Sequence, residues 1–268
     1  ELSDPAIELF NWIDTVGGLI PKKNIYKVPF FNTEEIEEYN PWRVCPIGEH
    51  WVKQHDRQKK KLEDVDGHCR KNKPKKDILV GDEIELITQN SLFINSAPKL
   101  SPAELGFNGR GSKYDNLISG WTAYWNDLYK INPPLPPSYV KALIATESGF
   151  DPKGYNPLNS SKIGPARGLG QITEVTQRSL SGNKKELKNH FVILSDDTDV
   201  YDPNKNICAT VRWLFRKRET ARARLKREPT WEEVLMEFKG RLKSRTKKTE
   251  DIRRELRKYI KDAGGILQ

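Results

Sequence analysis

Glu147 is the residue of this sequence that is best placed for acid–base chemistry. It continues the apolar stripe of a helix predicted over 139–148, with Ser138 as the N-cap and Gly149 as the terminating residue. Burial and the negative end of the helix dipole would both raise the pKa of this carboxyl group. A carboxyl group protonated near neutral pH can donate a proton to a leaving oxygen. The alternative is an ordinary exposed glutamate in a last helical turn.

A glycine-spaced loop follows this helix. Gly164, Gly168 and Gly170 fall within seven residues, and a second helix is predicted after Gln171. Such spacing suits tight turns or the close approach of a ligand. No Gly-Lys-Ser/Thr follows, which excludes a phosphate-binding loop. A plain connector is the alternative.

Histidine and cysteine gather in the N-terminal part, at Cys45, His50, His55, His68 and Cys69. Four of these five side chains could hold a structural zinc ion, although their spacing is not that of a standard zinc finger. A disulfide between the two cysteines is an alternative for a protein that works outside the cytoplasm. Ordinary packing is the third.

The charge of the chain is unevenly distributed. The 268 residues carry 46 Lys+Arg and 37 Asp+Glu, a net charge of +9. Residues 1–115 hold 17 basic and 19 acidic residues, whereas residues 116–268 hold 29 and 18. The excess therefore lies in the C-terminal half and favours an anionic partner. No apolar run approaches the roughly 18 residues that a membrane span requires, which excludes a transmembrane role.

The composition predicts an α+β protein, mainly α. Short extended runs such as 78–80 and 84–88 indicate an N-terminal accessory module over residues 1–112. Apolar residues at helical spacing predict a helical domain over residues 113–268. The polar, glycine-rich segment 108–112 is the predicted linker.

Three ordered motifs resemble the soluble lytic transglycosylase and goose-type lysozyme group of the lysozyme-like superfamily. That group has a helix ending in Glu-Ser-x-Phe, then Ser-x-x-Gly-Ala-x-Gly-Leu-Met-Gln, then an Asp-Pro-x-x-Asn-Ile helix start. The corresponding segments are Glu147-Ser148-Gly149-Phe150-Asp151-Pro152, Ser161-Lys162-Ile163-Gly164-Pro165-Ala166-Arg167-Gly168-Leu169-Gly170-Gln171 and Asp202-Pro203-Asn204-Lys205-Asn206-Ile207. The resemblance covers about residues 115–245.

The resemblance implies a lysozyme-like catalytic domain with Glu147 as the acid. Its proton would go to the glycosidic oxygen between N-acetylmuramic acid and N-acetylglucosamine, and no cofactor is required. The residues implied to line the cleft are Ser161, Gly168, Leu169 and Gln171. Phe238 is a further implied substrate-binding residue, at the position of a Tyr-Asn-x-Gly motif near the end of the family domain. Ser161 as a turn residue and Gln171 as a helix-entry residue are the alternatives.

The chain departs from the family pattern at three places. Pro165 separates a Gly and an Ala that are adjacent in the family. Gly170 replaces a methionine, which predicts a wider or more flexible spot in the cleft floor. The terminal Tyr-Asn-x-Gly corresponds at best to Phe238-Lys239-Gly240, so the tyrosine hydroxyl that contacts the acid is absent.

Two reactions use one catalytic acid. Transglycosylation releases a 1,6-anhydro sugar and needs no second carboxylate. Inverting hydrolysis needs a general base about 6.5–9.5 Å from the acid. The candidates for a second carboxylate are Asp151, Glu174 and Asp197, although Asp151 also suits a turn cap and Asp197 a solvated loop.

These observations predict a peptidoglycan-cleaving muramidase that acts in the bacterial periplasm or cell wall. Because no leader follows Glu1, we expect a fragment or processed product, such as an antibacterial effector or a phage lysin. Its expected partners are glycan strands, the anionic envelope, and an immunity or delivery protein. One alternative is a nucleic-acid-binding protein, since basic and aromatic residues alternate over 212–261. The other is a non-catalytic wall-binding protein.

Overall fold

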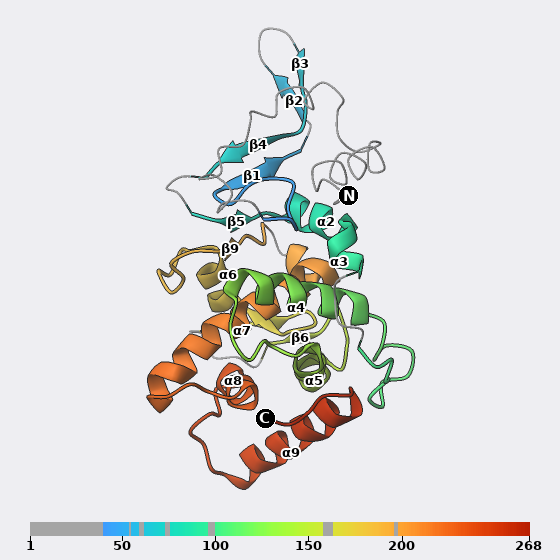
Figure 1. The fold of residues 1–268 in the computed structure, drawn as a ribbon, viewed down its shortest axis with the longest axis vertical. Coiled ribbons are helices and arrows are strands. Elements are labelled where there is room, and N and C mark those ends of the chain that lie inside the picture. The colour runs from blue at the N-terminus through green and yellow to red at the C-terminus, as the bar shows by residue number, and fades with distance from the viewer. Residues whose placement is uncertain are drawn as a thin grey trace, which may run out of the picture. The chain divides into compact units, whose positions relative to one another are not determined.

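The computed structural model describes residues 40–53, 55–58, 62–72, 76–95, 100–157, 163–195 and 198–268, with the backbone alone at 55–58 and 62–65 (Figure 1). Asn40–Gln268 forms one compact unit. The helices are α2 (Gly81–Gln89), α3 (Ser91–Asn95), α4 (Asp115–Tyr129), α5 (Pro137–Ser148), α6 (Glu174–Leu180), α7 (Pro203–Leu225), α8 (Trp231–Phe238) and α9 (Lys247–Asp262), with the 3₁₀ helix η3 (Asp199–Tyr201).

The strands are short. They are β1 (Glu49–Val52), β2 (His55–Gln58), β3 (Leu62–Val65), β4 (His68–Lys71), β5 (Ile78–Leu79), β6 (Tyr155–Asn156), β7 (Ala166–Arg167), β8 (Ile172–Thr173) and β9 (Phe191–Val192). β1 pairs with β4 and β2 with β3, both antiparallel, and β6, β7 and β8 form an antiparallel sheet. β5 and β9 pair in parallel. This mainly helical fold with short strands on its N-terminal side confirms the predicted fold class (Figure 1).

The core lies among α4, α5 and α7. Trp121 and Trp125 of α4, Leu143 of α5 and Leu214 of α7 are fully buried or nearly so. Burial of such large apolar side chains is the main favourable contribution to folding. The predicted helix that begins at the Asp-Pro motif is confirmed as α7, because Asp202 accepts a hydrogen bond from the Lys205 N–H and Pro203 occupies the first turn.

The strand predictions have opposite outcomes. Segment 78–80 is confirmed, because Ile78–Leu79 forms β5. Segment 84–88 is wrong, because it lies inside α2. Ile84 and Ile87 are three residues apart, so a helix brings both onto one buried face, whereas a strand would turn them to opposite faces.

Residues on either side of the predicted linker lie in the same compact unit. Within that segment the Gly111 N–H donates to Glu104 Oε2 over 2.9 Å. Trp42 packs edge-on against Tyr124 of α4, with ring centroids 6.0 Å apart, and its indole N–H donates to Asp127 over 2.9 Å. The division between residues 112 and 113 stays a prediction.

No helix in the part of the chain that the structure describes combines the length and the apolarity needed to cross a membrane.

Candidate active site

Helix α5 carries Glu147 out of the core at its last turn. The helix begins at Pro137, with Pro136 as its N-cap, so the prediction of Ser138 as the cap is wrong. Proline tolerates the first turn of a helix because that turn leaves its backbone N–H groups without helical partners. The predicted end is confirmed, because Gly149 adopts a left-handed conformation with φ 58°.

Glu147 faces a lysine from another helix. Its Oε1 accepts a hydrogen bond from Lys239 Nζ over 2.7 Å. The side chains of Glu147 and Lys239 are 18% and 11% exposed, respectively, so both are largely buried and neither is completely enclosed. We call Glu147 and Lys239 the α5 pair.

Burial and the lysine act on the carboxyl group in opposite directions. Removal from water disfavours the carboxylate and raises the pKa of Glu147, and the ammonium of Lys239 opposes this by charge and by hydrogen bonding. Burial prevails, so the pKa is raised overall. Such a carboxyl group can act as a general acid at a higher pH than an exposed glutamate.

The sequence comparison did not identify Lys239 as a site residue. It lies inside the Phe238-Lys239-Gly240 segment, which corresponds at best to the family Tyr-Asn-x-Gly motif and lacks its tyrosine. Phe238 is half-buried and packs against the core. The contact to the acid is therefore present in this protein, and a lysine makes it.

The glycine loop is held by Asn206 of α7. Asn206 is fully buried, its Oδ1 accepts the Gly170 N–H over 2.8 Å, and its Nδ2 donates to Val200 O over 2.7 Å. Gly168 has φ +71°, and a Cβ there would collide with Asn206 Nδ2. The Asp-Pro-x-x-Asn-Ile segment thus anchors the loop through Asn206.

The prediction of a wider or more flexible spot at Gly170 is wrong. A Cβ at this position would collide with Oγ1 of Thr210, from helix α7. The volume that a larger side chain would need is occupied by that helix. Glycine is therefore the residue that lets α7 pack closely against the loop.

The other residues implied to bind substrate lie in different surroundings. Leu169 is fully buried in the core. Gln171 bridges the loop, because its Nε2 donates to Gly154 O over 3.2 Å and to Gly168 O over 3.0 Å. Ser161 lies outside the described residues.

The three candidates for a second carboxylate have different surroundings. Asp151 Oδ1 accepts the Lys153 N–H over 2.9 Å, which makes it a turn cap. Glu174 is exposed in the first turn of α6, beside Gly164. Asp197 lies outside the described residues.

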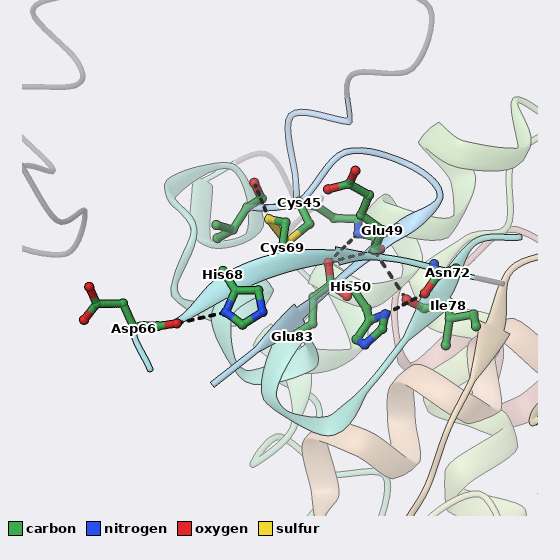
Figure 2. The surroundings of a disulfide bond; sticks show 11 residues. Cys45, Glu49, His50, Asp66, His68, Cys69, Asn72, Ile78 and Glu83 are labelled. Atoms are coloured by element: carbon green, nitrogen blue, oxygen red, sulfur yellow. Dashed lines mark hydrogen bonds and ion pairs between the residues drawn. A yellow bond between two sulfur atoms is a disulfide. The ribbon is translucent and has the colours of Figure 1, made fainter. Parts of the chain in front are cut away.

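The cysteines of the N-terminal cluster form a disulfide. Cys45, in the loop before β1, is bonded to Cys69 of β4 (Figure 2). His50 Nδ1 lies 2.6 Å from Asn72 Oδ1, and His68 Nδ1 lies 2.9 Å from Asp66 O. The His55 side chain lies outside the described residues.

With its two sulfur atoms joined, this cluster offers no thiolate for zinc. Among the described residues no three His, Cys, Asp or Glu side chains converge as metal ligands would. Of the three alternatives for the cysteine pair, the structure contains the disulfide.

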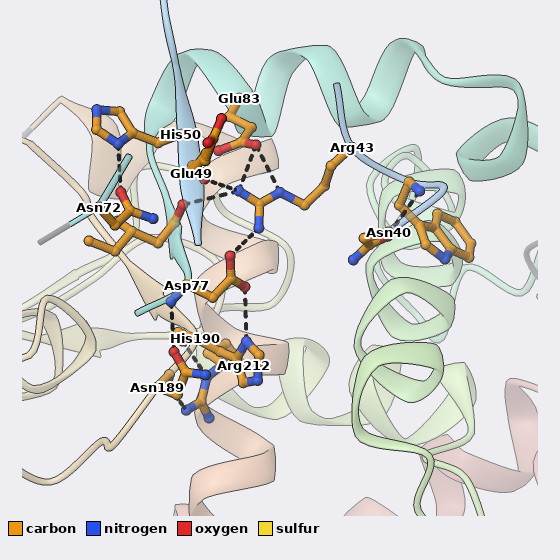
Figure 3. Close-up of polar contacts among 12 residues, drawn as sticks. Asn40, Arg43, Glu49, His50, Asn72, Asp77, Glu83, Asn189, His190 and Arg212 are labelled. Atoms are coloured by element: carbon orange, nitrogen blue, oxygen red, sulfur yellow. Dashed lines mark hydrogen bonds and ion pairs between the residues drawn. The ribbon is translucent and has the colours of Figure 1, made fainter. Parts of the chain in front are cut away.

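A second buried ion cluster lies far from the α5 pair in sequence. The guanidinium of Arg43 is bound by Glu83 and Asp77, and all three side chains are fully buried (Figure 3). Asp77 also contacts His190 Nδ1 over 2.9 Å. We call Arg43, Asp77 and Glu83 the Arg43 cluster.

Arg43 affects the two acids unequally. Burial raises the pKa of Glu83 to about 7, although Arg43 opposes it. Asp77 has its pKa lowered overall, because hydrogen bonds and charge from His190 and Arg43 outweigh its burial. The cluster therefore favours one ionised carboxylate over two.

Residues 127–235 match the family model of the transglycosylase SLT domain. The match runs from the end of α4 into α8, includes Glu147 and the glycine loop, and ends before Lys239. No curated protein matches the chain.

The family match confirms the resemblance of this stretch to the lysozyme-like, lytic transglycosylase superfamily. It supports a glycosidase of lytic transglycosylase type that acts on cell-wall peptidoglycan.

Proposed function

We propose that this protein cleaves the β-1,4 bond between N-acetylmuramic acid and N-acetylglucosamine, with Glu147 as the general acid. The observation that carries the proposal is the carboxyl group itself. It lies in the last turn of a largely buried helix within the matched stretch, its pKa is raised, and the Glu147 side chain retains 18% exposure. A proton donor must have both properties, since it has to hold a proton and reach the glycosidic oxygen.

For the route we propose lytic transglycosylation. It needs no second carboxylate, and Asp151 is already used as a turn cap. Glu174 is the candidate base for the alternative, inverting hydrolysis. Mass spectrometry of released muropeptides separates the two, because transglycosylation leaves 1,6-anhydro ends and hydrolysis leaves reducing ends.

The decisive variant is Glu147→Gln. The amide keeps the size of the side chain and an oxygen for Lys239, so the fold and melting temperature should be nearly unchanged. Digestion of purified peptidoglycan should fall by about 10²- to 10⁴-fold, the usual contribution of a general acid. Glu174→Gln is the matched control and should keep its activity. Full activity in Glu147→Gln would refute the assignment.

We also propose that the protein acts in the bacterial periplasm or cell wall, as an antibacterial effector or phage lysin with an immunity or delivery partner. The Cys45–Cys69 disulfide suits an oxidising compartment, and the basic C-terminal half suits an anionic envelope. Expression in bacteria with an export signal should cause lysis, whereas cytoplasmic expression should not. Equal effects in both compartments would contradict this.

The nucleic-acid alternative has little support from the surface. Phe215 and Trp231 are almost fully buried, so they are not available for stacking on bases. Arg212 is also buried and donates to the backbone carbonyls of Asn189 and His190. These buried members of the 212–261 stretch are explained by core packing.

A further inference from the structure

We propose that Lys239 is the positioning residue of this active site: its ammonium group orients the Glu147 carboxyl group and limits the pH range in which the site works. This inference rests on the proposed function of Glu147. It assigns a role to a residue that lies outside the stretch matched by the family model.

The ammonium is fixed at two points of the last turn of α5. Nζ donates to Glu147 Oε1 over 2.7 Å and to the Thr146 carbonyl oxygen over 3.4 Å. The backbone of Lys239 is fixed as well, because it is the C-cap of α8 and its N–H donates to Leu235 O over 3.1 Å. The lysine therefore joins the end of α8 to the end of α5 and restricts the rotamers of the carboxyl group between them.

A charged hydrogen-bond donor differs from a neutral one in its effect on the pKa of the acid, and therefore on the pH dependence of the reaction. The resemblance implies a tyrosine hydroxyl at this contact, which would orient the acid without adding charge. An ammonium orients it equally but stabilises the carboxylate, so it favours loss of the proton. The acid is therefore held in place at the expense of activity at high pH.

Three other charged groups on the helices that pack against α5 are paired with residues other than Glu147. Asp115 of α4 pairs with Lys141 over 2.8 Å, Glu237 of α8 pairs with Arg224 over 3.2 Å, and Arg257 of α9 pairs with Glu232 over 2.7 Å. Burial and Lys239 are the influences that act on the pKa of Glu147. Removing the lysine should consequently raise this pKa further.

Two substitutions separate orientation from charge. Lys239→Gln keeps a hydrogen-bond donor and removes the charge, whereas Lys239→Met removes both. Activity needs protonated Glu147, so it falls as pH rises through its pKa. In both variants this fall in kcat/KM should move to higher pH by about 1–3 units, the usual effect of a nearby opposite charge. In Lys239→Met alone, kcat at low pH should also drop by about 10- to 100-fold, because the acid is misplaced.

The controls are Lys239→Arg, which keeps the charge, and Lys243→Met, which removes an exposed lysine nearby. Both should keep the wild-type pH profile. Melting temperatures confirm folding, and if Lys239→Met does not fold, Lys239→Gln and Lys239→Arg still test the charge.

A carboxyl ¹³C NMR titration of Glu147, assigned with Glu147→Gln, gives a readout that does not depend on turnover. Unchanged pH profiles and titrations in Lys239→Gln and Lys239→Met would overturn the inference. A wild-type protein that never cleaves peptidoglycan would instead refute the proposed function, while the titration still reports on the pair.

Discussion

The α5 pair and the Arg43 cluster are built from the same parts but differ in their access to water. Each places a cation against a carboxyl group whose pKa is raised by burial. The side chains of Glu147 and Lys239 are 18% and 11% exposed, whereas those of Arg43, Asp77 and Glu83 have no exposed surface. A proton donor must reach its substrate, and a structural ion cluster need not.

The comparison also shows how each group of charges is balanced. The α5 pair has one carboxyl group and one ammonium group. The Arg43 cluster shares one guanidinium between two acids, with His190 as a further partner of Asp77 (Figure 3). Loss of the cation should therefore affect function in the first case and folding in the second.

The largest effect on stability should come from Arg43→Met. It leaves two buried carboxyl groups without their cation, and breaking a buried ion pair in this way costs about 3–5 kcal/mol of unfolding free energy. Urea denaturation measures the loss, while the protein that remains folded should still digest peptidoglycan.

Arg254→Met is the control for this experiment. Arg254 forms an ion pair with Asp251 but is 79% exposed, and such surface pairs contribute about 0–1 kcal/mol. Equal losses of unfolding free energy in the two variants would contradict the distinction between buried and solvent-accessible charges.

The disulfide tests whether a covalent link supports the Arg43 cluster. Cys45 is two residues from Arg43, and its bond to Cys69 spans a sequence separation of 24. Cys45→Ala with Cys69→Ala should lower the unfolding free energy by about 3.5 kcal/mol, the chain-entropy value for a loop of this size. Cleavage by the folded protein should be unaffected.

A reductant supplies the control, since it should destabilise the wild type and not the double variant. Combination with Arg43→Met measures the coupling, because independent sites give additive losses. Strict additivity would mean that the disulfide and the cluster act separately.

The smallest effect is a change in pH dependence. Burial raises the pKa of Glu83 in the folded protein to about 7, above its ordinary value of 4.5. A raised pKa stabilises the fold at low pH, and this stabilisation is lost as pH rises through about 7. Relative to Glu83→Gln, the wild type should thus lose on the order of 3 kcal/mol between pH 4.5 and 8.

Thermal unfolding of both proteins across this range provides the measurement. Glu85→Gln is the control, because Glu85 is exposed on the same helix and should not alter the slope. Parallel stability curves for wild type and Glu83→Gln would mean that Glu83 stays ionised beside Arg43.

Local sequence patterns predicted some helix boundaries correctly and others wrongly. The end of α5 at Gly149 and the Asp202-Pro203 start of α7 were predictable, because capping acts within one helical turn. The prediction of a strand over 84–88 is wrong because a short apolar run fits both a strand and a buried helix. The prediction that α5 starts after Ser138 is wrong, because proline and serine both suit the start of a helix and the helix begins at Pro137.

By itself the sequence determined the mainly helical fold, the family of residues 127–235 and the candidate acid Glu147. These features depend on residue types at short sequence spacing, and local backbone geometry alone determines how such closely spaced residues are arranged. Only the tertiary structure decided that Lys239 contacts Glu147, that Thr210 fills the space beside Gly170, and that Arg43 joins Asp77 to Glu83. Those contacts join residues 34 to 92 positions apart, so they exist only after the helices have packed.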